Sequence, residues 1–122
     1  MMHTELEVYK SSMLLVKLVY SVTEKFPRDE VWGLTSQMKR AATSVPTNIA
    51  EGCGRKSRKE LAQFLNIALG SITELSTQIE IADMLGFILD KETVTDCQSL
   101  TQKVKRQLVG LIRSTDNNAA QH

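Results

Sequence analysis

Few side chains in this sequence have the types and spacing that catalysis or metal binding requires. The two histidines, His3 and His122, stand at opposite ends of the chain, where neither gains the rigid setting that a general base or a metal ligand needs. Helix bundles that hold two metal ions use Glu-x-x-His pairs, and no histidine falls inside a predicted helix. We therefore predict no histidine catalysis, no metal site and no cofactor.

The two cysteines are the next candidates for chemistry. Arg55 or Lys56 would favour the thiolate of Cys53, but the sequence offers no positioned partner base for it. We therefore interpret Cys53 as a structural residue. Cys53 and Cys97 are isolated from each other, and in a chain without an export signal we expect both to be reduced thiols.

A short glycine motif matches a known binding motif only in part. Residues 52–54 read Gly-Cys-Gly, like the beginning of a dinucleotide-binding motif. Ser57 occupies the position of the third glycine, and a predicted helix rather than a strand precedes the motif. We interpret residues 52–54 as a turn that ends a helix.

Several carboxylates could supply an acid and base pair in principle. These residues are Glu51, Glu60, Glu74, Glu80 and Asp83. Carboxylates on helices are usually solvated, so we assign none of them a catalytic role. Glu51 has a structural explanation instead, because it can form an ion pair with Lys39, Arg40 or Arg55.

Positive charge is concentrated in two places, although the formal net charge is only +1. The window from Gln37 to Glu60 carries +4, and the rest of the chain carries −3. Its basic residues, the first basic set, are Lys39, Arg40, Arg55, Lys56, Arg58 and Lys59. A second basic set shares one face of the last predicted helix and consists of Lys103, Arg106 and Arg113, with Lys105 nearby.

These basic sets predict an affinity for phosphate, because residues 55–59 adjoin the free backbone amides of the following predicted helix. The alternative is an ordinary solvated surface, which on the last helix is favoured by cations near a helix C-terminus. The sequence has no recognisable aromatic stacking platform or base-reading motif. We therefore do not predict sequence-specific recognition of nucleic acid.

The first predicted helix, residues 4–25, has a wide apolar face made of two neighbouring stripes. The stripes are Leu6, Tyr9, Met13, Val16 and Tyr20, and Val8, Leu15, Val19, Val22 and Phe26. A face this wide predicts contact with more than one neighbour and permits an oligomer. Thr4 and Glu7 have capping-box spacing, and Pro27 makes continuation beyond Phe26 unfavourable.

The second predicted helix covers residues 29–52, with Asp29 as its N-cap. Its apolar stripe is Val31, Leu34, Met38, Ala41, Val45 and Ile49. Pro46 lies inside this pattern, where it removes a backbone donor and crowds the preceding turn. We therefore expect a kink or a break near Pro46, and an end at Gly52 and Gly54.

The third predicted helix begins after Ser57, which forms a capping box with Glu60, and ends at Gly86 as a left-handed C-cap. Its apolar stripe is Leu61, Leu65, Ala68, Ile72, Leu75, Ile79 and Ala82. Asp90 is the predicted N-cap of the fourth helix. The stripe of that helix is Val94, Cys97, Leu100, Val104, Leu108 and Leu111.

Short connections between these segments predict an all-α protein with an up-down-up-down four-helix bundle. We expect one domain over residues 1–115 and a disordered C-terminal tail over residues 116–122. The longest uncharged stretch, residues 61–73, is thirteen residues, well short of the roughly 20 apolar residues that span a bilayer. With no signal peptide visible either, we expect no membrane contact and a cytoplasmic location.

Three stretches of the sequence resemble a known bacterial family. They are residues 37–42 (Gln-Met-Lys-Arg-Ala-Ala), residues 44–52 (Ser-Val-Pro-Thr-Asn-Ile-Ala-Glu-Gly) and residues 64–82, which include Phe-Leu-Asn-Ile-Ala-Leu-Gly-Ser at their start. The chain is similar to four-helix bundle proteins encoded in intervening sequences of 23S ribosomal RNA genes, the so-called ribosomal protein S23 family. The resemblance extends over most of the chain.

This resemblance implies a left-handed bundle that assembles into a ring-shaped homopentamer. It also implies kinship with accessory proteins of diversity-generating retroelements, which bind nucleic acid and a reverse transcriptase. It supplies no enzymatic activity. We therefore expect a non-enzymatic oligomeric bundle that binds structured RNA, its complexes or DNA through backbone charge.

Two other functions stay open from the sequence. The protein can be an interaction scaffold that binds a protein partner without touching nucleic acid. It can also be an enzyme that uses acidic residues across a subunit interface. Salt-sensitive retention of RNA, salt-tolerant capture of one protein partner and reproducible turnover separate the three possibilities.

Overall fold

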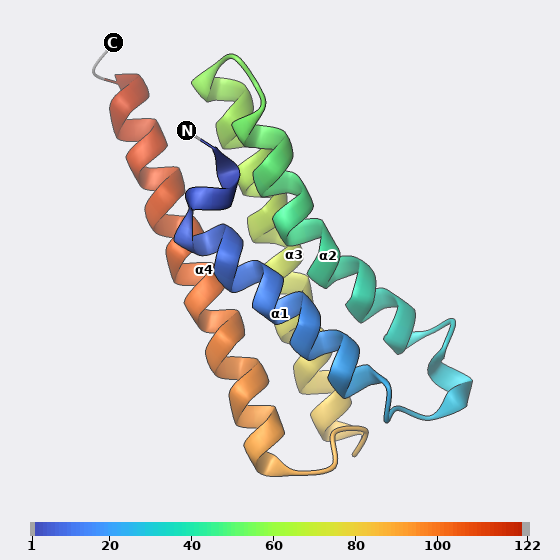
Figure 1. Cartoon of the computed structure of the whole chain (residues 1–122). Helices are drawn as coiled ribbons and strands as arrows, with labels where there is room; N and C mark the ends of the chain where they lie inside the picture. The colour runs from blue at the N-terminus through green and yellow to red at the C-terminus, as the bar shows by residue number, and fades with distance from the viewer. Residues whose placement is uncertain (1, 121–122) are drawn as a thin grey trace.

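The computed structural model describes the backbone of residues 2–120 and the side chains of residues 2–116. Four α-helices make up most of this part of the chain: α1 (Glu7–Thr23), α2 (Leu34–Cys53), α3 (Arg58–Met84) and α4 (Lys91–Ala120). Two short 3-10 helices, η1 (His3–Glu5) and η2 (Arg28–Glu30), precede α1 and α2. Successive helices run in opposite directions (Figure 1). The predicted all-α four-helix fold is confirmed.

Each helix packs against two others, so the bundle has a square cross-section. α1 contacts α2 and α4, and α3 contacts the same two helices. The core between them contains the predicted stripes of α3 and α4, in which Leu65, Ile72, Ile79 and Leu108 are fully buried. One contiguous apolar cluster therefore fixes the relative positions of all four helices.

The predicted signals at both ends of α3 are confirmed. The side chain of Ser57 accepts a hydrogen bond from the backbone N–H of Glu60 at 3.1 Å, which caps the first turn. At the other end Gly86 has φ +76°, and the N–H of Phe87 donates to the carbonyl of Ala82 at 2.9 Å. This pattern is a Schellman motif, in which a left-handed glycine reverses the chain after the helix.

Asp90 caps α4 as predicted. Its carboxylate accepts hydrogen bonds from the backbone N–H of Thr93 at 2.7 Å and from the Thr93 hydroxyl at 2.9 Å. These two bonds lower the pKa of Asp90.

The helix α4 continues to Ala120, past Asp116, where we predicted the disordered tail to begin. Residues 121–122 of that predicted tail lie outside the described residues.

The predicted start of the first helix is wrong. Thr4 lies in η1, and α1 begins after Leu6, which has an extended backbone and makes no side-chain cap. The ring of His3 lies edge-on to Tyr9, with 4.9 Å between ring centroids, and Leu6 packs against the core. Packing of this first turn onto the bundle therefore prevails over the capping-box spacing of Thr4 and Glu7.

The start of α2 also differs from the prediction. Asp29 belongs to η2, and α2 begins after Gly33. Glu30 supplies the missing cap from outside the helix, because its Oε2 accepts a hydrogen bond from the N–H of Leu34 at 3.0 Å. The cap of α2 is thus provided by Glu30, the residue next to Asp29, which we predicted as the N-cap.

The helix α2 is not broken at Pro46. It runs continuously from Leu34 to Cys53 with the proline ring buried. Side chains next to the proline satisfy nearby carbonyls: the Thr47 hydroxyl donates to the carbonyl of Thr43 at 2.7 Å, and the Asn48 amide donates to that of Ser44 at 2.8 Å. These bonds support the turns on either side of the missing backbone donor.

Candidate nucleic-acid interface

The connection between α2 and α3, together with the first turn of α3, carries four of the six residues of the first basic set. Gly54 ends α2, and its N–H donates to the carbonyl of Ala50 at 3.2 Å, which confirms the interpretation of residues 52–54 as a helix-ending turn. Gly52 is buried where α2 meets α3, and a Cβ there would lie 3.0 Å from side-chain atoms of both Leu61 and Phe64. Glycine thus allows α2 and α3 to approach closely just before the connection.

Arg55 is held against the surface of the bundle. Its guanidinium forms an ion pair with Glu51 at 3.3 Å and lies 4.9 Å from the centroid of the Phe64 ring. The ion pair confirms one of the three partners that we considered for Glu51. Because its charge is balanced by a neighbouring carboxylate, Arg55 is a weaker phosphate ligand than the basic residues that follow it.

Lys56 in the connection and Arg58 and Lys59 at the start of α3 have exposed side chains. Among the side chains of residues 2–116, none of these three takes part in an ion pair. Their charges therefore face solvent without a fixed counter-charge. This is the arrangement that favours binding of a mobile polyanion.

Lys39 and Arg40 lie away from the rest of the first basic set. From Lys39 to the end of α2 the helix rises by about 21 Å, at 1.5 Å per residue. The ammonium group of Lys39 lies 4.8 Å from the centroid of the Tyr20 ring, and Arg40 lines a polar hollow with Ser44 and Ser71. The first basic set, which lies in one window of the sequence, therefore occupies two separate places in the structure.

The second basic set instead approaches the α2–α3 connection. Arg58 and Lys59 line a hollow of about 660 Å³ together with Thr115 and Asp116 from the far end of α4. Arg113 is exposed three residues before Asp116, on the adjoining face of the same helix. The start of α3 and the end of α4 therefore meet because the two helices are antiparallel.

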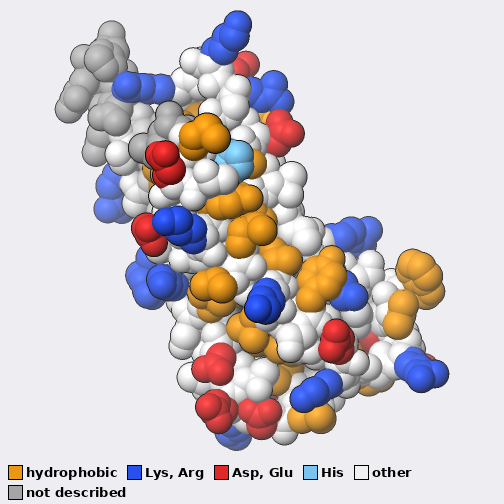
Figure 2. All heavy atoms as spheres, viewed as in Figure 1, with side chains coloured by type: hydrophobic (Ala, Val, Ile, Leu, Met, Phe, Trp, Pro, Cys, Tyr) orange, Lys and Arg blue, Asp and Glu red, His pale blue; other side chains and the backbone are white. Residues whose placement is uncertain are grey.

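We call the combined region the terminal basic surface. It consists of Lys56, Arg58, Lys59 and Arg113, and Arg106 and Lys103 follow at helical spacing along α4. Figure 2 shows Lys and Arg side chains around this end of the molecule and along α4. Three carboxylates also lie beside it: Glu60, Asp116, and Glu7, which lines a hollow with Gln107 and Leu111 of α4. Sequence reasoning identified these residues but treated them as two separate surfaces.

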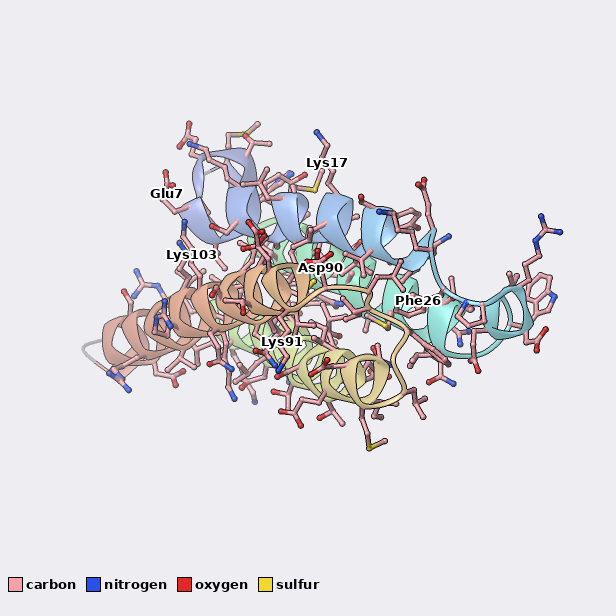
Figure 3. All side chains as sticks on the ribbon, turned by 90° about the horizontal axis from the view of Figure 1, so that it is seen from below. Glu7, Lys17, Phe26, Asp90, Lys91 and Lys103 are labelled. Carbon is pink, nitrogen blue, oxygen red and sulfur yellow. The ribbon has the colours of Figure 1, made fainter. Side chains whose placement is uncertain are left out.

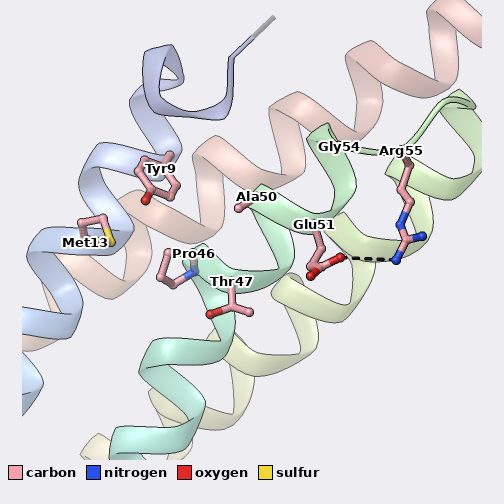
Figure 4. Close-up of a pocket in the computed structure, with 8 residues that line it drawn as sticks. All are labelled: Tyr9, Met13, Pro46, Thr47, Ala50, Glu51, Gly54 and Arg55. Carbon is pink, nitrogen blue, oxygen red and sulfur yellow. Dashed lines mark hydrogen bonds and ion pairs between the residues drawn. The ribbon is translucent and has the colours of Figure 1, made fainter.

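A second feature near this end is a groove between α1 and α2, which sequence reasoning missed (Figure 4). It has a volume of about 600 Å³. It is lined by Tyr9, Met13, Pro46, Thr47, Ala50, Glu51, Gly54 and Arg55. Figure 4 shows the Glu51–Arg55 ion pair on one side and the apolar Tyr9, Met13 and Pro46 on the other. The groove is thus amphipathic and continues the apolar band over α1 in Figure 2.

The two cysteines are poor nucleophiles in this structure. Burial raises the pKa of the Cys53 thiol, the opposite direction to the activation that catalysis would need. Burial, and then the neighbouring carboxylate of Asp96, raises the pKa of Cys97 to about 11. Both thiols are free, Cys97 being buried and Cys53 half-buried.

The carboxylates that we considered for catalysis do not form a metal-binding cluster. Within the described residues, no group of three or more His, Cys, Asp or Glu side chains is arranged to hold a metal ion. Glu74 accepts a hydrogen bond from the side-chain amide of Gln78 at 3.2 Å, and Glu51 is paired with Arg55. The helices of the described part also include none long and apolar enough to cross a membrane.

The fold and the exposed basic side chains define an antiparallel four-helix bundle with a charged end. The chain belongs to the family of 23S rRNA-intervening sequence proteins, whose sequence model matches residues 4–110. The resemblance noted from the sequence is therefore confirmed.

A solved structure has the same fold. It is the crystal structure of a protein with unknown function from the S23 ribosomal protein family of Bacteroides thetaiotaomicron. The two chains are 21% identical and superpose with a TM-score of 0.79, over 93% of this chain and 99% of that one. A search of curated protein sequences finds no match to this chain.

Proposed function

We propose that this protein is a non-enzymatic, oligomeric helical bundle of the cytoplasm that binds structured RNA, or complexes that contain it, through the nucleic-acid backbone. The observation that carries the proposal is the terminal basic surface, where exposed, unpaired basic side chains from α3 and α4 meet. Arg58 and Lys59 lie on the first turn of α3, so the spacing of their backbones is fixed before a ligand arrives, and Lys56 lies just before the N-cap Ser57.

Backbone phosphate is the ligand that this chemistry favours. Lys and Arg side chains bind phosphate by charge and release counterions, whatever the base sequence. Base recognition needs side chains that read base edges or stack on bases, and the terminal basic surface consists of flexible cations. The proposed binding is therefore sensitive to salt and tolerant of sequence.

The proposed oligomer is the ring-shaped homopentamer of left-handed bundles implied by the family resemblance. The outer face of α1 supports assembly, since Met13, Leu14 and Tyr20 are all substantially exposed although they belong to a packed helix. A ring repeats the terminal basic surface around its axis. Several weak phosphate contacts then act together on one nucleic-acid molecule.

A second candidate function is a scaffold that binds a protein partner. The groove between α1 and α2 favours it, because Tyr9, Met13 and Pro46 offer an apolar wall beside an ion pair. An amphipathic helix of a partner is the kind of ligand that such grooves accept. This binding would persist at high salt.

The test is a titration of labelled RNA and DNA against the protein by fluorescence anisotropy at several salt concentrations. We expect affinity to fall steeply with salt, and the log–log slope to decrease by about one for each phosphate-contacting residue removed. The variant Lys56→Ala/Arg58→Ala/Lys59→Ala should weaken binding of unrelated sequences equally and keep its helical circular dichroism.

The matched control is Lys39→Ala/Arg40→Ala, which removes two cations of the same window from a different part of α2. It should bind as the wild type does. A third variant, Lys103→Ala/Arg106→Ala/Arg113→Ala, should lose affinity for nucleic acid as the first variant does. The reason is that both variants remove residues of the terminal basic surface. If the wild type shows no salt-dependent binding of RNA or DNA, this proposal is wrong and the scaffold function takes its place.

A further inference from the structure

The opposite end of the bundle carries a highly exposed tryptophan. Trp32 lies in the connection between α1 and α2, and 91% of its surface is exposed. Val31 beside it is 48% exposed. Tryptophan is the largest apolar side chain in proteins, and exposing it on a protruding connection is costly unless another surface covers it.

A groove lies at the same end on a different side of α1. Leu18 and Val22 of α1 form one wall, and Phe87, Ile88 and Leu89 of the connection between α3 and α4 form the other. The groove has a volume of about 130 Å³, and Leu89 is 73% exposed at its edge. Its apolar walls are joined by polar side chains, Ser21 and Thr93, and by the charged Lys25 and Asp90.

The tryptophan and the groove stand at the same height on the bundle. The rings of Phe26 and Phe87 pack with 5.5 Å between centroids, which joins the two connections at this end. In Figure 3, which looks onto this end, the α1–α2 connection extends to one side of Phe26 and Asp90 lies on the other. Trp32 is exposed, so it does not fill the groove of its own chain.

The charges around the two features are complementary. Arg28 and Asp29, both exposed, accompany Trp32 on the protruding connection. Lys25 and Asp90 stand on the rim of the groove. Each region therefore carries one exposed charge of each sign, which allows Asp29 to pair with Lys25 and Arg28 with Asp90 in a contact between copies. The hydrogen bonds from Thr93 lower the pKa of Asp90.

We propose that Trp32 of one chain inserts into the groove between α1 and the α3–α4 connection of a second copy. This inference rests on the proposed oligomer and names the contact that builds it. Because the inserted residue and its receptor are different surfaces at one height, the contact is heterologous, the type of contact that builds a ring when the rotation between successive copies closes.

Trp32 contributes only part of the interface. One buried tryptophan removes about 150–250 Å² from solvent, whereas a stable interface buries at least about 1,200 Å² in total. The exposed apolar face of α1 and Leu89 supply further area. Trp32 is therefore the central anchor of the contact rather than its whole extent.

The test uses the fact that Trp32 is the only tryptophan of the chain. Its emission spectrum reports directly on burial of this side chain. In the wild type we expect a blue-shifted emission at micromolar concentration that moves to the red as dilution separates the chains, in parallel with the mass from light scattering. The variant Leu89→Arg, which fills the groove with charge, should show red-shifted emission at all concentrations.

The variant Trp32→Ala should raise the concentration for half-assembly by roughly tenfold or more, as loss of an interface anchor does. Ile67→Ala, an exposed apolar residue of α3 outside the proposed contact, is the matched control and should shift assembly far less. A charge reversal provides a rescue: Lys25→Glu should weaken assembly, and adding Asp29→Lys should restore it.

Two results overturn the inference. An oligomer that persists unchanged in Trp32→Ala, with solvent-exposed tryptophan emission in the wild type, shows assembly through another surface and leaves the proposed oligomer intact. A wild type that is monomeric at every concentration tested rules out both the Trp32 contact and the proposed oligomer. Emission that shifts to the blue only when RNA is added assigns Trp32 to nucleic acid and rejects the contact between copies.

Discussion

The two ends of this bundle present different chemistry, although the same four helices form both. At one end, the α2–α3 connection, the start of α3 and the last turns of α4 expose Lys56, Arg58 and Arg113, which form no ion pair with the side chains of residues 2–116. At the other, the connections expose Trp32 and Leu89 beside the buried Phe26 and the partly buried Phe87. The comparison teaches that a bundle with an ordinary core can separate exposed basic side chains from exposed apolar ones by about the length of its helices.

The largest expected effect comes from the core that joins the two ends. Leu65→Ala, near the basic end, and Ile79→Ala, near the apolar end, should each cost roughly 2–5 kcal/mol of unfolding free energy, because both side chains are fully buried. Denaturant titration followed by circular dichroism and by amide hydrogen exchange at the two ends would measure this loss. The two probes should give the same midpoint in each variant.

Non-coincident midpoints would show that the ends unfold separately, and would break the view of one cooperative bundle. A matched control is Ile67→Ala, because Ile67 lies on α3 but is about half exposed. It should cost much less than either core substitution.

A smaller effect is expected at the close approach that supports the basic end. Gly52→Ala places a methyl group 3.0 Å from Leu61 and Phe64 atoms, so these neighbours must move by a few tenths of an ångström to accommodate it. We expect a loss of roughly 1–3 kcal/mol in unfolding free energy, the usual cost of overpacking. Thermal or chemical unfolding would measure it.

Gly70→Ala is the control for Gly52→Ala, since a Cβ at Gly70 meets no other atom within 4 Å on an equally helical segment. It should be neutral or stabilising by up to about 1 kcal/mol. Equal effects of the two substitutions would contradict the tight contact at the basic end.

The smallest effect concerns the two thiols, one toward each end. Both have a raised pKa, to about 11 for Cys97, so native Cys97 should react with a thiol reagent at pH 8 more slowly than Cys53, which is half-buried. A raised thiol pKa means that the folded state favours the protonated form. Its stabilisation is complete below pH 9 and is lost as pH rises through about 11.

Unfolding measured between pH 8 and 11 would test this pH dependence in the wild type and in Cys97→Ala. The alanine variant should be less stable at pH 8 and should lose less stability with rising pH. An identical pH dependence in the two proteins would rule out Cys97 as the titrating group.

The helices and their core were largely predictable, because apolar residues spaced by three and four bury themselves in a bundle whatever its partners. Ser57, Gly86 and Asp90 act as local signals whose hydrogen bonds form within a few residues, so the sequence contains them completely. The first turns of α1 and α2 were mispredicted because their ends depend on contacts that local spacing does not encode. Glu30 capping Leu34 is one such contact.

The candidate interface was predictable in its residues but not in its shape. Whether Lys39 stands with Lys59 or apart from it depends on the length of α2, and the meeting of Arg58 with the end of α4 depends on antiparallel register. The groove that accepts Trp32 in our proposal requires knowing how tightly Phe26 and Phe87 pack. These are tertiary relations between segments far apart in the sequence.

The position of the chain ends has a practical consequence for labelling. Because the described part of the chain has an even number of long helices, η1 and the last turns of α4 lie at the same end as the α2–α3 connection (Figure 1). A reporter protein fused to either terminus would therefore stand over the basic residues and obstruct a long polyanion. A small dye placed near the start of α4, for example at Glu92, would leave both termini and that surface free.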